Sequence, residues 1–318
     1  MRPHLYLLLF LGCSPDPSGP AKSDDTGAPT TTWGAGGTGT TPAGTATTPT
    51  GTATTTGEPG GCNRHVALCD RPLDQVVFAT THNSHAASDA GFTVFNANHD
   101  RGIAAQLRAG VRGLLLDVYD DDGELALCHG PCALGRIPHR EALTALVGFL
   151  DAHPREVVVL LYEDYVDPAD LEADFVATGA AALAYTHDGG AWPTLGALAD
   201  AGTPLVVTAQ TGRAPPGWLH NFWDLGFDTP YSYESIDAFS CDLNRGASDH
   251  DLFLVNHWVS TSLGLPDKGG AAEVNSAAVI EPRVRECQER WGRVANLVAV
   301  DWHEQGDLIE AVDRLNGL

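Results

Sequence analysis

From residue 76 to the carboxyl end, short apolar runs alternate with longer amphipathic stretches. The runs are rich in Val, Leu and Ala, as is usual for strands that are buried on both faces. Stretches 140–152 and 305–315 repeat their apolar positions with the spacing of a helix. This order predicts βα units around a parallel sheet. We expect its strands at 76–79, 113–118, 157–162, 205–209, 253–256 and 297–300.

The 257 residues from 62 to 318 (318 minus 61) match the size of one α/β barrel, which is about 250 residues. We therefore expect a single domain of the α/β class. Polar residues follow or close each apolar run, and in a barrel these strand ends meet at the catalytic face. They are Thr81-His82-Asn83-Ser84, Asp117, Glu163-Asp164, Gln210, Asn256-His257 and Asp301-Trp302.

Residues 1–13 have the pattern of a targeting segment. Arg2 is followed by an apolar run at 5–11, which is too short to span a bilayer. The run ends at Leu11-Gly12-Cys13 and resembles a bacterial lipoprotein signal. That resemblance implies cleavage before Cys13 and attachment of a diacylglycerol to its thiol. An ordinary secretory signal is the alternative.

Residues 14–61 consist mainly of Thr, Gly, Pro, Ala and Ser, and no charged residue occurs between Asp25 and Glu58. Such a segment has too few apolar side chains to offset the entropy of ordering. It predicts a disordered stalk between the targeting segment and the domain at 62–318.

The net charge of the chain excludes one class of function, and its cysteines predict disulfides. The chain has 18 Lys and Arg against 41 Asp and Glu, a formal net charge of -23, which excludes a general nucleic-acid binder. Without Cys13 the cysteines are even in number, which in an exported chain predicts disulfides. Proximity along the sequence favours Cys62 with Cys69, Cys128 with Cys132 and Cys241 with Cys287. A zinc site at Cys128, His129 and Cys132 is the competing interpretation.

Two histidines at or near strand ends, His82 and His129, are candidates for proton transfer because imidazole titrates near neutral pH. Asn83, Asp117 and Glu163 offer oxygen donors at three consecutive strand ends, which suits a hard cation such as Ca²⁺ or Mg²⁺. The alternative is that these carboxylates cap loops or pair with Arg112 and Arg101.

Several motifs together resemble the X region of phosphatidylinositol-specific phospholipase C. The resemblance is specific in order and spacing from about residue 62 to residue 163, and it continues more weakly to the end of the chain. The motifs are Thr81-His82-Asn83-Ser84, residues 106–113, Leu116-Asp117-Val118-Tyr119, Cys128-His129-Gly130, residues 149–154 and residues 159–163.

This resemblance implies a distorted TIM-type barrel that cleaves the phosphodiester between a glycerol and an inositol. It implies that His82 is the general base and His129 the general acid, with a cyclic inositol phosphate as the first product. It also implies that Asn83, Asp117 and Glu163 hold Ca²⁺ or Mg²⁺.

The sequence departs from the family pattern at four positions. Leu115 replaces a glutamate of the metal-dependent branch, and Asp117 replaces an arginine of the metal-independent branch. Thr208 and Gln210 stand where eukaryotic enzymes have lysines that hold ring phosphates. These departures favour phosphatidylinositol without ring phosphates, or another phosphodiester lipid.

We assign Gln210, His257, Asp301 and Trp302, at the remaining strand ends, to substrate binding. We expect a monomeric, exported lipoprotein of an outer membrane or cell surface, held by its lipid anchor, or alternatively a secreted enzyme. Two other functions remain open: a glycerophosphodiesterase or sphingomyelinase D-like enzyme, and a non-catalytic binding module on the same fold. This sequence lacks the opening motif expected of the other phosphodiesterases. Leu115 and the absence of the lysines favour the non-catalytic binding module.

Overall fold

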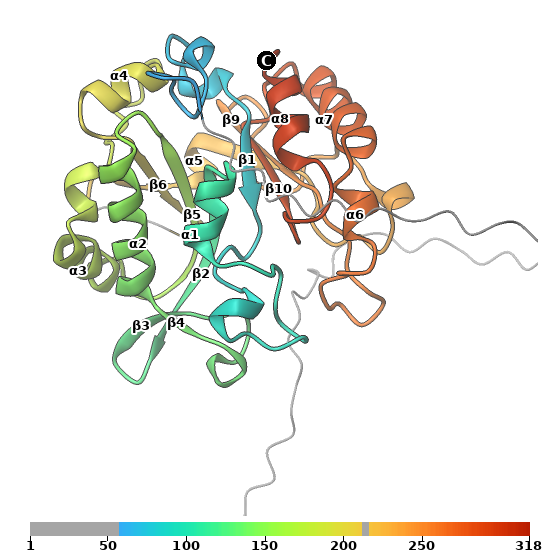
Figure 1. Cartoon of the computed structure of the whole chain (residues 1–318), viewed down its shortest axis with the longest axis horizontal. Helices are drawn as coiled ribbons and strands as arrows, with labels where there is room; N and C mark the ends of the chain where they lie inside the picture. Colours follow the sequence, from blue (N-terminus) through green and yellow to red (C-terminus); the bar gives the residue numbers. More distant parts are fainter. Residues whose placement is uncertain (1–56, 212–215) are drawn as a thin grey trace, which may run out of the picture. The chain divides into compact units, whose positions relative to one another are not determined.

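The computed structural model describes residues 57–211 and 216–318 (Figure 1). The targeting segment 1–13, Cys13 and most of the predicted stalk 14–61 lie outside the described residues. Within the described ranges, no helix is both long enough and apolar enough to cross a membrane.

The described residues form one largely parallel sheet. Its strands are β1 (Phe78–Thr81), β2 (Gly113–Asp121), β3 (Glu124–Leu127), β4 (Ile137–Pro138), β5 (Val158–Tyr165), β6 (Leu205–Ala209), β7 (Leu219–Asn221), β8 (Gly226–Asp228), β9 (Leu252–Asn256) and β10 (Leu297–Val300). The order is β7-β6-β5-β2-β1-β10-β9-β8, with parallel pairing throughout. The strands β3 and β4 are antiparallel and extend the sheet from β2.

The two edges of this sheet are joined by a very short connection. Strand β7 lies at one edge and β8 at the other, yet only helix α5 (Phe222–Leu225) separates them along the chain. Four helical residues span about 6 Å at a rise of about 1.5 Å per residue. The sheet must therefore curl until its edges approach each other. The result is a half-open barrel in place of a flat sheet.

Helices cover the outside of the curled sheet (Figure 1). The larger ones are α1 (Ile103–Ala109), α2 (His139–Ala152), α3 (Pro168–Thr178), α4 (Leu195–Asp200), α7 (Ala277–Trp291) and α8 (Leu308–Leu315), and α6 (Ala271–Val274) is a single turn. One apolar cluster joins α1, α2 and α3 to β2, β5 and β6, and another joins α7 and α8 to β1, β9 and β10.

The interior of the barrel has its own apolar cluster, made by alternate residues of the same strands. Leu115, Leu161, Leu254 and Ala299 belong to it, whereas their neighbours Leu114, Leu116 and Leu160 face the helices. This alternation is the period of two that every strand imposes on its side chains. Residues two positions further along each strand therefore also face the interior.

Close packing of β1 against β2 requires a residue without a side chain. Gly113 is paired with Thr80, and a Cβ at Gly113 would collide with the Thr80 side chain. A glycine at the start of β2 thus allows the two strands to approach.

The fold prediction is confirmed in class and in its main elements. Each predicted strand overlaps an observed one, and stretches 140–152 and 305–315 overlap α2 and α8. Strand β1 begins two residues later than predicted because its pairing with β10 starts at Phe78. Strands β3, β4, β7 and β8 were missed, since they are short or lie in a hairpin.

All three predicted disulfides are present: Cys62–Cys69, Cys128–Cys132 and Cys241–Cys287. The competing zinc site at Cys128, His129 and Cys132 is wrong, because both of its thiols are consumed in one disulfide.

Candidate active site

Polar side chains form a layer at the carboxyl ends of the strands, above the apolar interior. Each lies two positions beyond an interior-facing residue, so the strand alternation directs it inward. Six strand ends contribute His82, Asp117, Glu163, Gln210, Asn256 and Asp301.

His82 is held on two sides. Its Nδ1 lies 2.9 Å from Asp301 Oδ1, and its ring stacks on Trp258 with the ring centroids 3.9 Å apart. Asp301 is buried and also accepts a hydrogen bond from Asn98 Nδ2 at 2.8 Å. Since an ionised carboxylate only accepts, this geometry places a proton on His82 Nδ1 and leaves Nε2 to act on a substrate.

Asn83 lies between His82 and Asp117 and occupies a left-handed backbone conformation, with φ 48°. With its amide nitrogen toward Asp117 it donates to both carboxylate oxygens at 3.1 Å, and its oxygen accepts from His82 Nε2 at 3.2 Å only when His82 carries a proton on both ring nitrogens. The opposite amide orientation puts three oxygens together, which only a cation between them makes favourable.

Asp117 and Glu163 are direct neighbours in the register of β2 and β5. Burial of Asp117, together with the nearby Glu163 carboxylate, raises the pKa of Asp117 well above its usual range. Two adjacent carboxylates in a poorly solvated position favour either a proton or a cation.

The alternative partners of these carboxylates are wrong. Arg112 forms a buried ion pair with Glu156 at 2.6 Å, and Arg101 lies 3.8 Å from Asp89. Glu163 accepts hydrogen bonds from Tyr165 Oη at 2.9 Å and from Gln210 Nε2 at 3.1 Å. Asn83, Asp117 and Glu163 thus supply hard oxygen donors that fit Ca²⁺ or Mg²⁺.

His129 reaches this layer because the chain folds back on itself. Strand β3 returns along β2 through a turn at Asp122-Gly123, and the Cys128 amide donates to the Asp117 carbonyl at 3.3 Å. His129 Nδ1 then lies 2.8 Å from the Asn96 carbonyl.

Burial lowers the pKa of His129, and the charge of a protonated His82 lowers it further. The Asn96 carbonyl and the carboxylates of Asp301 and Glu163 act in the opposite direction. The hairpin that brings His129 to this end of β2 was not predicted. The Asp-Gly pair between alternating residues is the sequence signal that would have found it.

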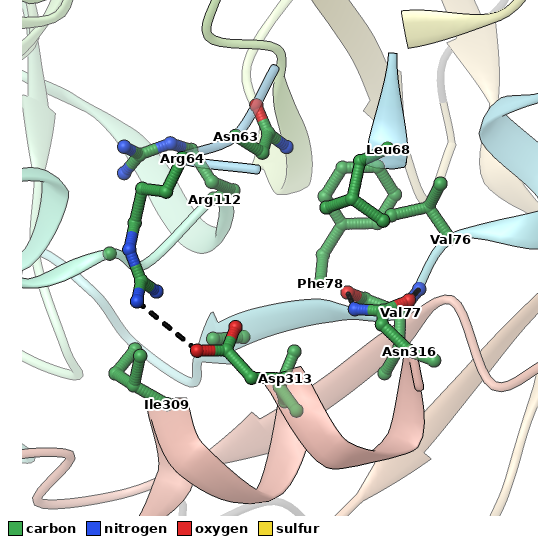
Figure 2. Close-up of a pocket in the computed structure, with 13 residues that line it drawn as sticks. Asn63, Arg64, Leu68, Val76, Val77, Phe78, Arg112, Ile309, Asp313 and Asn316 are labelled. Atoms are coloured by element: carbon green, nitrogen blue, oxygen red, sulfur yellow. Dashed lines mark hydrogen bonds and ion pairs between the residues drawn. The ribbon is translucent and has the colours of Figure 1, made fainter. Parts of the chain in front are cut away.

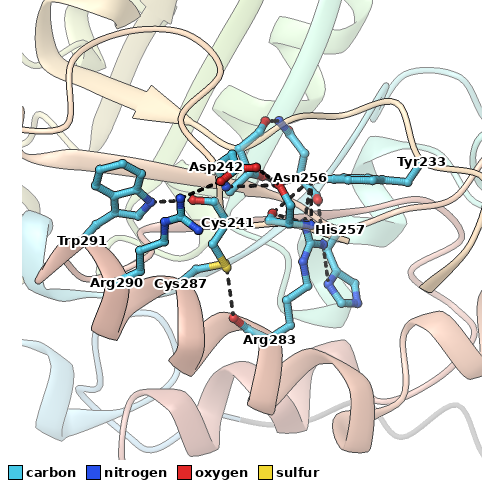
Figure 3. Close-up of a disulfide and its surroundings, with 11 residues drawn as sticks. Tyr233, Cys241, Asp242, Asn256, His257, Arg283, Cys287, Arg290 and Trp291 are labelled. Carbon is cyan, nitrogen blue, oxygen red and sulfur yellow. Dashed lines mark hydrogen bonds and ion pairs between the residues drawn. A yellow bond between two sulfur atoms is a disulfide. The ribbon is translucent and has the colours of Figure 1, made fainter. Parts of the chain in front are cut away.

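Two of the four predicted substrate-binding residues, His257 and Trp302, are buried. His257 is fully buried, with Nε2 2.8 Å from the Val274 carbonyl and Nδ1 3.0 Å from Arg283 Nη1 (Figure 3). It follows inward-facing Asn256 by one residue and therefore points outward. Trp302 is also buried, in an apolar cluster with Phe92.

The other two predicted substrate-binding residues, Asp301 and Gln210, lie in the polar layer and make different contacts there. Asp301 orients His82, as described above. Gln210 bridges Glu163 and Arg245, whose Nη1 lies 3.2 Å from Gln210 Oε1.

Arg245 was not predicted as a site residue, although it lies in the part of the chain where the resemblance to the family is weaker. It forms an ion pair with buried Asp228 at 2.6 Å and lies against the rings of Trp223 and Tyr231, at 4.4 and 4.8 Å from their centroids. Asn256 Nδ2 also donates to Asp228, at 3.2 Å. A chain of polar contacts thus runs along the strand ends from His82 to Asn256.

A separate pocket lies at the opposite end of the barrel (Figure 2). Its lining includes Phe78, the first residue of β1, and Val76 and Val77 just before it, and it is crossed by the Arg64–Asp313 ion pair at 3.1 Å. His82 follows the other end of the same strand. This pocket therefore has no part in the polar layer.

Comparison with known proteins agrees with this geometry. A sequence model of the PI-PLC X family matches residues 68–316. The chain belongs to the PI-PLC X family. PI-PLC X domain-containing protein 1 of Arthroderma benhamiae is 30% identical over 283 residues, which cover 81% of this chain and 90% of the fungal protein. A PI-PLC X domain-containing protein of Arabidopsis thaliana is 26% identical over 77% of this chain and 63% of the plant protein.

Among solved structures, a mutant of the phosphatidylinositol-specific phospholipase C of Staphylococcus aureus matches with a TM-score of 0.56 at 14% identity. The match covers 78% of this PI-PLC X chain and 95% of the bacterial one. A likeness at this identity shows the fold, and it confirms the predicted TIM-like barrel. Family and fold together indicate a phosphodiesterase type of activity.

Proposed function

We propose that this chain is a metal-assisted phosphodiesterase that cleaves the headgroup bond of a phospholipid, with phosphatidylinositol lacking ring phosphates as the preferred substrate. The observation that carries the proposal is the convergence of His82 and His129 beside Asp117 and Glu163. Contacts link His82 through Asn83 to Asp117 and its neighbour Glu163, and the hairpin brings His129 to the end of β2 that carries Asp117.

His82 is suited to the role of base because Asp301 fixes its Nδ1 proton and leaves Nε2 for a substrate hydroxyl. The oxygen freed by this proton transfer attacks phosphorus, and the bond from phosphorus to the glycerol oxygen breaks. His129 is suited to donate a proton to that leaving oxygen, since its Nδ1 is anchored on Asn96 and its Nε2 is available. The products are a cyclic phosphodiester and diacylglycerol.

Asn83, Asp117 and Glu163 would hold the Ca²⁺ or Mg²⁺ ion. When bound, such a cation lowers the pKa of an attacking hydroxyl and offsets negative charge at phosphorus. Leu115, two residues before Asp117 on the same face of β2, packs among apolar residues and adds no ligand. We therefore expect a cation site with fewer protein ligands than in the metal-dependent branch.

The preference for a substrate with an unphosphorylated inositol ring follows from the charges of the side chains at the strand ends. Thr208 is fully buried and donates to the Leu160 carbonyl, and Gln210 is neutral. The nearby cation, Arg245, is already paired with Asp228. Neutral donors and acceptors of this kind suit ring hydroxyls better than additional phosphates.

We further propose that the chain is exported and anchored through Cys13, as a monomer at an outer membrane or cell surface. The three disulfides favour an oxidising compartment. A fungal relative, 24% identical over 81% of this chain, is named an uncharacterized secreted protein. Mass analysis of the mature amino terminus would reveal either a diacylated Cys13 or a free secreted form.

A non-catalytic binding module remains the second candidate, and the apolar surroundings of Leu115 favour it. Turnover separates the two. We expect the purified chain to release diacylglycerol from phosphatidylinositol vesicles and to leave a cyclic phosphate. It should be less active on phosphorylated inositides and on glycerophosphodiesters or sphingomyelin.

His82→Ala and His129→Ala should each lower turnover by about 10²–10⁴-fold, the usual contribution of proton transfer. The double variant should be little worse, because attack and departure share one transition state. His153→Ala, at an exposed histidine directly after α2, is the matched control. Binding without turnover on every lipid would support the non-catalytic module and contradict the proposal.

A further inference from the structure

A second group of metal-ligating side chains lies beside the backbone of His82. It consists of His99, His303 and Glu304, and one ligand atom of each lies within 4.8 Å of the other two. Both histidines are buried, whereas Glu304 reaches the surface. The segment with His99 runs beside the segment with His303 and Glu304, and the Trp302 amide donates to the Asn98 carbonyl at 2.7 Å.

The ring of His99 is fixed in one tautomer. Its Nε2 lies 2.7 Å from the His82 carbonyl oxygen, which can only accept, so Nε2 carries a proton. Full burial favours the neutral ring. Nδ1 of His99 therefore presents a lone pair, and it faces His303 Nδ1 at 3.5 Å.

This arrangement has too few protons for its acceptors. His303 Nδ1 faces both the His99 lone pair and Glu304 Oε2, the latter at 3.3 Å. One proton on His303 Nδ1 can satisfy only one of these two acceptors, and both contacts are long for a hydrogen bond. If that proton goes to Glu304, the lone pair of the fully buried His99 Nδ1 is left unpaired, which is unfavourable.

A metal ion removes the conflict, because all three atoms can then act as lone-pair donors. Zinc binds imidazole nitrogen and carboxylate oxygen at about 2.0–2.2 Å, which makes ligand atoms of a tetrahedral site about 3.3–3.5 Å apart. The distances from His303 Nδ1 to His99 Nδ1, 3.5 Å, and to Glu304 Oε2, 3.3 Å, have this spacing. The third pair lies within 4.8 Å, and rotation of the Glu304 side chain would shorten it.

The groups around the ligands are those that metal sites use to orient them. A ligating histidine commonly donates its other ring proton to a carbonyl, as His99 does to His82. Glu304 Oε1 accepts from the Arg101 amide at 2.7 Å, which turns Oε2 toward His303.

We propose that His99, His303 and Glu304 bind one divalent transition-metal ion, for which Zn²⁺ fits the donor set and the spacing best. Water completes the fourth position. This site shares no residue with Asn83, Asp117 and Glu163, and its imidazole donors select a softer ion than their oxygens do.

The proposed zinc site connects the segment that carries the candidate base, His82, to the segment that carries its partner, Asp301. His99 holds the His82 carbonyl, and His303 follows Asp301 by two residues. Bound zinc would therefore stiffen the His82–Asp301 pair. Metal binding itself does not depend on the proposed phosphodiesterase activity; only this effect on turnover rests on it.

The test uses the full chain, stripped of metal with a chelator and then titrated with Zn²⁺. We expect Zn²⁺ to raise the melting temperature of the wild type by at least about 2 °C. Glu304→Gln and His303→Gln should lose that rise and weaken Zn²⁺ affinity by about tenfold or more in calorimetry. Co²⁺ in place of Zn²⁺ should give the strong visible absorption of a tetrahedral site in the wild type, and weak absorption in His303→Gln.

Two control variants show which group of side chains binds the ion. His153→Gln, at an exposed histidine, and Asp117→Asn, in the oxygen-donor group, should both retain the zinc response. The proposal is overturned if Zn²⁺ leaves the wild-type melting temperature unchanged. It is also overturned if Glu304→Gln and His303→Gln respond like the wild type, or if the response disappears in Asp117→Asn instead. These measurements do not involve lipid, so a failed turnover assay leaves them unaffected.

Discussion

His82 and Asp301 are 219 positions apart in the sequence, yet a hydrogen bond of 2.9 Å joins Nδ1 of the one to Oδ1 of the other. Parallel pairing of β1 with β10 brings them together, because Thr81 is in register with Val300 and each residue of the pair follows directly. Asp301 thus determines which nitrogen of His82 faces the substrate.

The first prediction concerns this pair. Asp301→Asn should lower kcat by about 10²–10⁴-fold with little change in KM, because the amide can donate to Nδ1 and favour the wrong tautomer of the base. Steady-state kinetics on phosphatidylinositol measure both constants. Asp200→Asn, at an exposed aspartate, is the control and should behave as the wild type. A change confined to KM would mean that Asp301 binds substrate and does not orient His82.

The second prediction concerns the cation. A Ca²⁺ chelator should abolish turnover of the wild type, and added Ca²⁺ should restore it. Asp117→Asn and Glu163→Gln should be inactive at low Ca²⁺ and partly active in excess, since loss of one ligand weakens affinity before it removes the chemistry. Asp164→Asn, at the next residue of β5, is the control. Full activity of the wild type in chelator would rule out the proposed metal role.

The third prediction concerns the loop of His129. Replacement of Cys128 and Cys132 by serine should lower kcat while the melting temperature changes little. The reason is that the disulfide closes only a short loop but fixes the residue beside His129. Replacement of Cys62 and Cys69, far from the polar layer, should leave kcat unchanged. Equal kcat in both double variants would show that the disulfide does not position His129.

The fourth prediction concerns acid stability. Burial, and next the charge of Arg283, lower the pKa of His257 to about 3, whereas the unfolded chain has the ordinary value of 6.5. Above pH 6.5 the ring is neutral in both states and pH has no effect through this group. Below 6.5 the unfolded state takes up the proton first, so the free energy of unfolding falls by about 1.4 kcal/mol per pH unit until about pH 3.

Denaturant melts at pH 7.5 and pH 5 test this linkage. His257→Gln, which can keep both hydrogen bonds without titrating, should lose less stability between these two pH values than the wild type. His153→Gln should lose as much as the wild type. Equal losses in His257→Gln and the wild type would mean that other buried groups dominate the acid transition.

The sequence by itself determined six of the ten strands in the described residues, the fold class and most of the polar layer. Buried parallel strands are continuous apolar runs, and the residues that end them are inward-facing by period alone, as with Asp117 and Glu163. Cysteine pairs close in sequence have few other partners within reach, which is why Cys62–Cys69 and Cys128–Cys132 were predictable.

Only the tertiary structure decided which contacts each of these residues makes. The curl of the sheet sets which strand ends are neighbours, so Asp301 turned out to orient His82, and His257 and Trp302 turned out to be buried. The hairpin β2–β3 carries His129 over the layer, and a loop far along the chain adds Arg245. Contacts between residues distant in sequence depend on strand register and on the paths of loops. Local apolar patterns contain no information about either.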